Sequence, residues 1–175
     1  VNKGHDRKIL NIVVGDTGEF ELTIFDYHYT TGGGEHQQRH KRSVALMESA
    51  ELRLPAFTLR PESMFDKLGA VLGMQDIDFT SHPIFSKMYL LKGDDEGQIR
   101  EFFNDAILSM MQQKQKLCVE AIPGKIIVYY ANKPPAADQL KSLFSEALEI
   151  YSVFADRAKD MPANSIQDPA NVDQN

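Results

Sequence analysis

Residues 19–31 read Glu-Phe-Glu-Leu-Thr-Ile-Phe-Asp-Tyr-His-Tyr-Thr-Thr, and this stretch decides the fold. In an extended chain, successive side chains point to opposite faces. Bulky apolar side chains then occupy both faces, with Phe20, Leu22 and Ile24 on one and Phe25, Tyr27 and Tyr29 on the other. A strand that is apolar on both faces is typical of an interior position, so the stretch predicts a central strand of a sheet.

The segments on either side of this strand predict a meander of antiparallel strands. Residues 8–14 are rich in β-branched side chains and predict a strand, and Gly15-Asp16-Thr17-Gly18 is a turn signal after it. Three glycines at 32–34 reverse the chain, which makes 38–48 the returning strand of a long hairpin. Three glycines are more than a tight turn needs, so we expect a loose tip.

The rest of the chain alternates short strands with amphipathic helices. Strands are predicted at 56–59, 85–91, 117–122 and 125–131, and helices at 61–72, 95–111 and 137–158. Pro123-Gly124 joins the last two strands as a hairpin turn, and Asp95 with Gln98 resembles a capping box. The fold class that follows is α+β. It is a largely antiparallel sheet with helices packed on one face, in the approximate order ββββαβαββα.

Length and composition fit one folded domain with a tail. Of the 175 residues, 42% are hydrophobic. A chain of this length can bury roughly 70% of its unfolded surface without a disulfide or a metal. We therefore expect a single α+β domain over residues 1–158. Residues 159–175 contain two prolines and little to bury, so they predict a disordered C-terminal tail.

Several function classes are disfavoured by charge and composition. The net charge is −6, whereas nucleic-acid binding is typical of strongly basic domains, so no nucleic-acid partner is expected. Cys118 is the single cysteine and lies in an apolar run, which predicts a small buried side chain rather than a reactive thiol. The sequence contains no run of about 18 apolar residues, so no membrane span is predicted. No motif indicates a bound cofactor or metal ion.

The densest polar cluster is the returning half of the long hairpin. Its candidate binding residues are His36, Arg39, His40, Lys41 and Arg42. One interpretation is a flexible basic tip that meets an anionic membrane surface or an acidic protein partner, with roughly 1 kcal/mol gained per Lys or Arg near such a surface. The other is a solvated hairpin whose positive charges pair across strands with Asp26 or Glu21.

Histidine spacing in the hairpin does not predict a metal site. Along a strand His36 and His40 would share a side but lie about 13 Å apart, which is too far for one ion. A further ligand such as His28 would be needed from the neighbouring strand. We therefore predict no metal centre.

Two other polar groupings admit a chemical and a structural interpretation. Asp78 and His82, with Ser81 beside the histidine, could serve a hydrolase, but no nucleophile elbow is present and the residues fit a turn. Arg60 precedes a predicted helix and could bind a carboxylate or phosphate there. More often, an arginine in this position pairs with a nearby acid. No catalytic residue is assigned.

Four segments carry a resemblance to a family of uncharacterised bacterial proteins. They are Phe-Asp-Tyr-His-Tyr-Thr-Thr-Gly-Gly-Gly at 25–34, Leu-Pro-Ala-Phe-Thr-Leu-Arg-Pro-Glu at 54–62, Asp-Phe-Thr-Ser-His-Pro-Ile-Phe-Ser at 78–86 and Tyr-Leu-Leu-Lys-Gly at 89–93. In that family similar segments follow one or two predicted N-terminal membrane helices. The family has no assigned activity. The resemblance therefore implies only a soluble domain beside a bacterial membrane, which the start at Val1 rather than methionine fits.

Three functional hypotheses follow. The first is a non-enzymatic domain for binding or assembly, tethered to the cytoplasmic face of a bacterial membrane by a segment outside this sequence. The second is a small-molecule or lipid-binding domain with an apolar pocket between the sheet and the C-terminal helix. The third is a hydrolase that uses His82 with Asp78.

Overall fold

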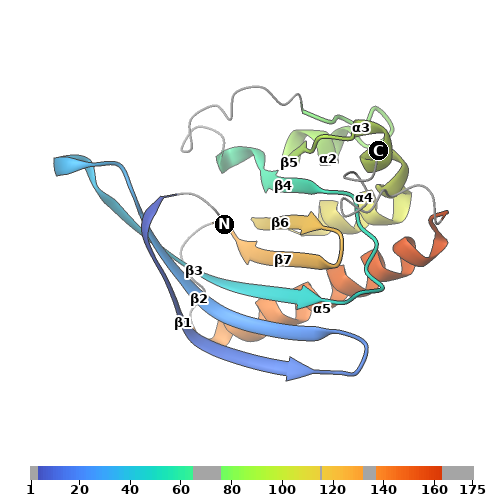
Figure 1. Cartoon of the computed structure of the whole chain (residues 1–175). Helices are drawn as coiled ribbons and strands as arrows, with labels where there is room; N and C mark the ends of the chain where they lie inside the picture. Colours follow the sequence, from blue (N-terminus) through green and yellow to red (C-terminus); the bar gives the residue numbers. More distant parts are fainter. Residues whose placement is uncertain (1–3, 65–75, 115, 132–136, 163–175) are drawn as a thin grey trace, which may run out of the picture.

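The protein folds around one seven-stranded antiparallel sheet, in the order β1-β2-β3-β7-β6-β4-β5 (Figure 1). The structure, a computed structural model, describes residues 4–64, 76–114, 116–131 and 137–162. The strands are β1 (His5–Asp16), β2 (Glu21–Thr31), β3 (Gln38–Glu48), β4 (Phe57–Pro61), β5 (Tyr89–Lys92), β6 (Leu117–Ile122) and β7 (Lys125–Tyr130). The α-helices described are α2 (Pro83–Met88), α3 (Glu96–Phe102), α4 (Asp105–Gln113) and α5 (Ala137–Asp160), and short 3-10 turns are η1 (Gly34–His36) and η2 (Glu62–Met64).

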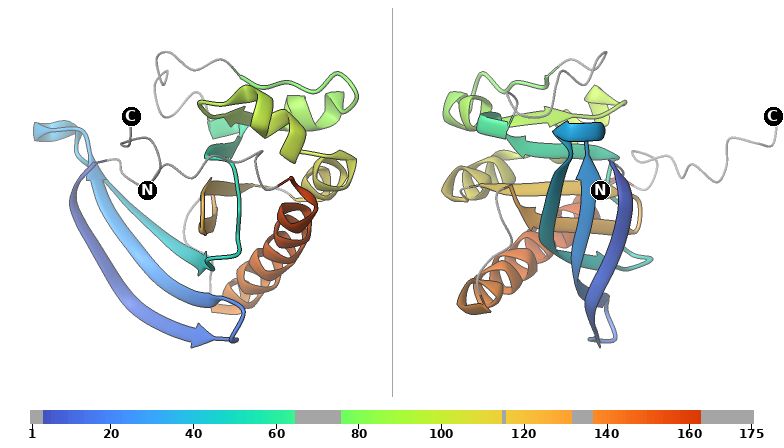
Figure 2. Two further views of the ribbon diagram at one scale, coloured as in Figure 1. Left: turned by 45° about the vertical axis from the view of Figure 1, so that its right-hand side comes forward. Right: turned by 90° about the vertical axis from the view of Figure 1, so that its left-hand side faces the viewer.

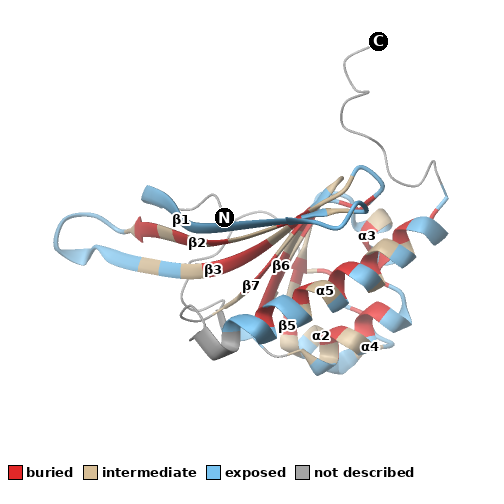
Figure 3. Ribbon diagram, turned by 90° about the horizontal axis from the view of Figure 1, so that it is seen from below, coloured by how far each residue is buried: buried red, intermediate tan, exposed pale blue. Residues whose placement is uncertain are grey.

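The helices cover one face of the sheet, and α5 lies across β3 and β7 (Figure 3). Strands β1, β2 and β3 are longer than the others and curve away from the helices, so that the β2–β3 turn projects beyond the rest of the molecule (Figures 1 and 2). We call these three strands the arm. The face of the sheet that carries the helices is the helix-side face, and the opposite one is the far face.

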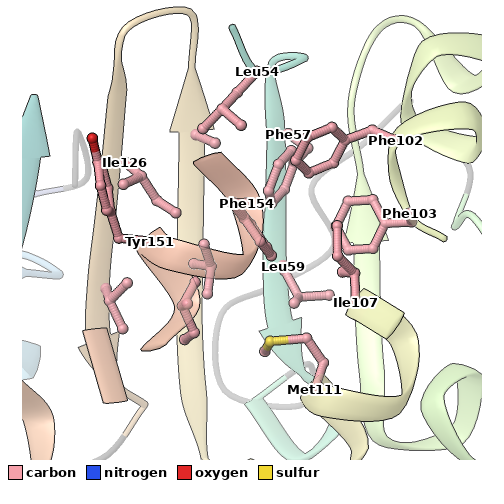
Figure 4. Close-up of a cluster of buried hydrophobic side chains, with 14 of the residues drawn as sticks. Leu54, Phe57, Leu59, Phe102, Phe103, Ile107, Met111, Ile126, Tyr151 and Phe154 are labelled. Atoms are coloured by element: carbon pink, nitrogen blue, oxygen red, sulfur yellow. The ribbon is translucent and has the colours of Figure 1, made fainter. Parts of the chain in front are cut away.

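The main core lies between the helix-side face and the helices. Its centre is a group of aromatic rings in which Phe154 of α5 lies 5.3 Å from Phe102 and 6.0 Å from Phe57, measured between ring centroids (Figure 4). Phe102 and Phe154 are completely buried. A buried side chain of this size contributes roughly 1.5–3 kcal/mol through the hydrophobic effect. The apolar faces of the helices therefore pack against the apolar face of the sheet, as the sequence predicts.

A second, smaller cluster lies on the far face. Its buried members are Phe25, Tyr27, Tyr29, Val44, Cys118 and Tyr129. Residues on the other side of β2, among them Leu22 and Ile24, pack with the main core instead. Strand β2 is therefore an interior strand with apolar side chains on both faces, as its sequence predicts.

The two predicted hairpins are confirmed in detail. Strands β2 and β3 pair without interruption from Glu21 opposite Glu48 to Thr31 opposite Gln38. In the second hairpin, Val119 lies opposite Val128, as the turn at Pro123-Gly124 predicts. The predicted cap is also present, since the Asp95 Oδ1 atom accepts a hydrogen bond of 2.9 Å from the backbone N–H of Gln98.

The mixed α+β class with an antiparallel sheet is correct, but the predicted order ββββαβαββα is wrong in two places. The predicted strand at 85–91 begins as helix α2, with Pro83 at its first position, and becomes strand β5 only at Tyr89. A short apolar run does not distinguish strand from helix, and Pro at a first helical position favours the helix.

The second error is the single helix predicted at 95–111. It is two helices, because Asn104 caps a new one by accepting a hydrogen bond from the Ile107 backbone N–H at 3.0 Å. Of the helix predicted at 61–72, the 3-10 turn η2 is described, and 65–75 lie outside the described residues. The last helix extends to Asp160, and Met161 beyond it is buried in the main core. Residues 163–175, in the predicted tail, also lie outside the described part.

Candidate functional site

The five candidate residues of the hairpin are divided between different positions. His36 is exposed in the turn η1 at the tip of the arm. Arg39 and Lys41 are exposed on β3, whereas His40 and Arg42 between and after them are half-buried. Because side chains alternate along a strand, Arg39 and Lys41 share the helix-side face and His40 and Arg42 share the far face. The sequence cluster is therefore two groups with different surroundings.

His40 and Arg42 are held by aromatic rings of the far face. The His40 ring stacks on Tyr29 at 4.7 Å between centroids, and its Nε2 atom is hydrogen-bonded to Thr31 Oγ1 at 2.7 Å. The guanidinium carbon of Arg42 lies 4.9 Å from the Tyr129 ring centroid, within cation–π range. Burial, assisted by the charge of Arg42, lowers the pKa of His40. These two side chains contribute to the packing of the far face.

Strand β1 brings a further cation to the exposed group. Lys8 lies opposite His28, and His28 lies opposite Lys41 in the next strand. The three residues therefore form one row across the arm on the helix-side face, with Arg39 two positions further along β3. We call Lys8, His28, Arg39 and Lys41 the basic face of the arm. Lys8 and Lys41 lie on either side of His28, so this arrangement places two exposed cations in one row and favours contact with an anion.

The other end of the arm is acidic. Asp16 lies opposite Glu21, which lies opposite Glu48. Glu48 forms a salt bridge with Lys125 of β7. The arm is therefore polarised along its length, with basic residues near its tip and carboxylates near the β1–β2 turn.

The carboxylate expected to neutralise the hairpin has other partners. Asp26 accepts hydrogen bonds of 2.7 Å from Ser43 Oγ and from Asn11 Nδ2. Glu21 lies in the acidic row at the far end of β2 from Arg39 and Lys41. Cross-strand pairing with these two acids therefore does not account for the exposed cations of the basic face.

The residues of the hydrolase hypothesis have structural contacts. The Nδ1 atom of His82 is 3.1 Å from the neighbouring Ser81 hydroxyl and 3.8 Å from Asp105, whose side chain is almost fully exposed. The backbone carbonyl of Asp78 accepts a hydrogen bond of 2.7 Å from Arg100. Among the described residues, no three His, Cys, Asp or Glu side chains are placed to hold a metal ion.

A polar network and a shallow groove occupy the far face over β4, β5 and β6. Arg60 pairs with Glu120 at 3.0 Å, and the Tyr129 hydroxyl donates to the same Glu120 oxygen at 2.7 Å. Arg60 therefore pairs with an acid, one of its two sequence interpretations. The groove, of about 290 Å³, has Arg60, Leu90 and Ile122 among its lining residues.

This groove lies on the opposite face from the pocket expected beneath the C-terminal helix. At the sheet–α5 interface the side chains of Leu143, Ala147, Ile150 and Phe154 are completely buried. Cys118 is completely buried too, and burial raises the pKa of its thiol to about 11. The expectation of a buried cysteine is confirmed.

Comparison with known proteins gives a fold relationship. No protein-family model matches the chain, and no curated protein sequence matches it. The crystal structure of the mycobacterial trehalose monomycolate transport factor A, TtfA, is similar to this chain with a TM-score of 0.58 and 10% sequence identity. The similarity covers 90% of this chain and 76% of that one. At this identity the two chains share a fold, and residue roles do not transfer.

The lengths and compositions of the helices show whether any of them could span a membrane. Within the ranges that the structure describes, no helix has both the length and the apolar character needed to cross a bilayer.

Proposed function

We propose that this domain is a non-catalytic binding domain that works at the cytoplasmic face of a bacterial membrane and contacts anionic lipid headgroups through the basic face of the arm. The observation that carries the proposal is the row of Lys8, His28 and Lys41 across three strands, with Arg39 beyond it. The fold shared with a factor named for trehalose monomycolate transport is compatible with a lipid-binding or assembly domain.

The position of the basic face supports contact with a broad surface. The β2–β3 turn projects beyond the helices, so the cations near it lie away from the body of the domain (Figure 2). Lys8, Arg39 and Lys41 are all exposed. A bilayer presents many weak anionic contacts, and exposed lysine and arginine side chains on a projecting arm match that requirement.

The expected strength explains why such a domain would be tethered. Three Lys or Arg residues near an anionic leaflet contribute roughly 3 kcal/mol in total, which is about a hundredfold in an equilibrium constant. That is weak for a free domain. A tether converts the contact into an intramolecular one with a high effective concentration, so modest electrostatics then suffice to orient the domain.

Vesicle co-sedimentation tests the proposal. The chain should bind phosphatidylglycerol vesicles at low salt, bind phosphatidylcholine vesicles much less, and be released by added salt. The double variant Arg39→Glu/Lys41→Glu should lose roughly a hundredfold in apparent affinity. The matched control is Lys87→Glu/Lys159→Glu, which reverses two exposed cations on α2 and α5 and should keep binding. Absence of binding at low salt, or equal losses in the two double variants, would refute the proposal.

A further inference from the structure

Strand β1 presents an apolar edge to solvent. It is the terminal strand of the sheet, and β2 is its strand partner among the described residues. Its five large aliphatic side chains are 42–65% exposed, and they are Ile9, Leu10, Ile12, Val13 and Val14. Natural edge strands are usually protected by charges, prolines, bulges or a cover, because an open edge pairs readily with another strand. Residues 9–15 carry no charge and no proline.

The ends of β1 carry opposite charges. Arg7 and Lys8 lie near its start and outnumber the neighbouring Asp6, and Asp16 lies at its end beside Glu21 of β2. Two copies of β1 placed antiparallel would bring the basic end of each against the acidic end of the other. A parallel pair would instead place like charges together. Charge complementarity therefore selects a second copy of this chain in antiparallel orientation, related by a two-fold axis.

The faces of β1 restrict the register of such a pair. Ile9 lies opposite Tyr27 and Val14 opposite Thr23, so both share the far face. Leu10 and Val13 lie opposite Asp26 and Ile24 and share the helix-side face. Directly opposed residues of paired strands must point to the same face. A dyad between Asn11 and Ile12 meets this condition, because it sets Ile9 against Val14 and Leu10 against Val13 of the other copy.

One of the two irregular parts of β1 falls on that dyad, and the other lies between His5 and Lys8. The pairing of β1 with β2 shifts between Leu10 and Val13, where Asn11 has a positive φ of 53°. Such a bulge disrupts regular pairing locally. The uninterrupted segments on either side, 8–10 and 13–16, would pair with each other across the two copies. A dyad at Asn11 itself would instead oppose residues that point to different faces.

We propose that two copies of this chain associate edge to edge through β1, antiparallel about an axis between Asn11 and Ile12, so that one sheet runs through both. On each face of the joined sheet, the aliphatic side chains of β1 lie beside those of the partner copy. The basic face near the tip of each arm keeps its exposed Arg39 and Lys41, so the pairing does not depend on the lipid contact proposed above.

Cysteine cross-linking tests the register. The double variant Leu10→Cys/Val13→Cys should form covalent dimers under mild oxidation, and mixing the two single variants should form them too. Either single variant alone should not. Leu10 and Val13 lie opposite Asp26 and Ile24, so residue 10 of one copy is displaced from residue 10 of the other by about 7 Å along the strands and about 5 Å across them, which together exceed disulfide reach. Ile9→Cys/Val13→Cys, with side chains on opposite faces, is the control. Cys118 is completely buried and does not compete.

Light scattering of the unmodified chain tests the association itself. A mass of two chains is expected, and Leu10→Lys/Val13→Lys should shift it to one chain with an unchanged circular dichroism spectrum. A wild-type chain that stays monomeric across its concentration range would overturn the proposal. Equal cross-linking of Leu10→Cys/Val13→Cys and Ile9→Cys/Val13→Cys would also overturn it. A third contrary outcome is a monomeric wild-type chain that binds vesicles and loses this binding in Leu10→Lys/Val13→Lys. That result would assign the edge of β1 to lipid contact.

Discussion

Asn11 donates a hydrogen bond of 2.7 Å from Nδ2 to the Asp26 carboxylate, across a bulge in which the Asn11 backbone has a φ of 53°. Among residues with a side chain, asparagine is one of the most tolerant of this left-handed conformation. Below the bulge, Asp16 lies opposite Glu21, and above it Lys8 lies opposite His28. The bulge shifts the register by one residue and thereby decides which face Lys8 occupies.

Replacement of Asn11 tests this role. Asn11→Val places a β-branched side chain at positive φ and removes the hydrogen bond to Asp26, so we expect a loss of roughly 1–3 kcal/mol in the free energy of unfolding. Asn11→Gly loses the same hydrogen bond but accepts the φ value, so it should cost about 1 kcal/mol. Chemical denaturation of both variants gives the comparison. Equal losses would mean that backbone conformation at residue 11 does not matter.

The same bulge shows why part of the site could not be predicted from the sequence. Counting back from the β1–β2 turn without an extra residue would pair Lys8 with Tyr29 and place it on the far face. In the run from Ile9 to Val14, Asn11 is compatible with a positive φ, but an asparagine alone does not predict a shift of register. The β2–β3 pairing, by contrast, follows from alternation and a glycine turn, and it is correct over its whole length.

The remaining differences between sequence and structure also have local causes. The first part of the strand predicted at 85–91 belongs to helix α2. Six residues are too few for the spacing of apolar side chains to distinguish a helix from a strand. The cap at Asn104 was a readable signal, since asparagine before aspartate favours a new helix start. The roles of His40 and Arg42 depend on Tyr29 and Tyr129, and Tyr129 is distant in the sequence.

Arg42 and Arg39 should differ in what they contribute, although they are three residues apart. Arg42→Ala removes a guanidinium that lies over Tyr129 and Tyr29, so the free energy of unfolding should fall by about 1–2 kcal/mol. Arg39→Ala removes an exposed side chain and should change it by less than about 0.5 kcal/mol, while vesicle binding weakens. Thermal denaturation and vesicle co-sedimentation of the two variants separate these effects. A larger loss of stability in Arg39→Ala than in Arg42→Ala would mean that Arg39, not Arg42, contributes to packing.

The ion pair between Arg60 and Glu120 should contribute more to stability than the Tyr129 hydroxyl that is hydrogen-bonded to the same carboxylate. Both side chains are largely buried, with 17% and 20% of their surfaces exposed. Glu120→Ala leaves the Arg60 charge without this carboxylate, so we expect a loss of roughly 2–4 kcal/mol, discounted from the value for a fully buried pair. Tyr129→Phe removes one hydrogen bond and should cost about 1 kcal/mol.

A double-mutant cycle isolates the pair itself. Arg60→Met retains the length of the side chain without its charge, and Glu120→Gln retains the shape of the carboxylate. If the ion pair contributes as described, the double variant should be more stable than the sum of the single losses implies, by about 1 kcal/mol or more. Strict additivity in urea denaturation would show that the two residues act independently.

The pKa values of two histidines of the arm should be shifted in opposite directions. The pKa of His5 is raised because its Nε2–H donates to the Gly32 carbonyl and its Nδ1 contacts Asp6. The pKa of His40 is lowered by burial and by the charge of Arg42. NMR titration of the ring protons should therefore place the midpoint of His5 above 6.5 and that of His40 below it. The opposite order would contradict the contacts described for both rings.

These shifts predict how stability responds to pH. The folded state binds the His5 proton more tightly than the unfolded state, so its contribution is fully present below about pH 6.5 and is lost as pH rises through the higher folded pKa. The folded state binds the His40 proton less tightly, so stability falls as pH drops from about 6.5 through the lower folded pKa. His40→Gln, which keeps a polar side chain without a titrating ring, should remove the acid-side decline and leave the His5 effect. An acid-side decline that persists unchanged in His40→Gln would show that another group titrates in that range.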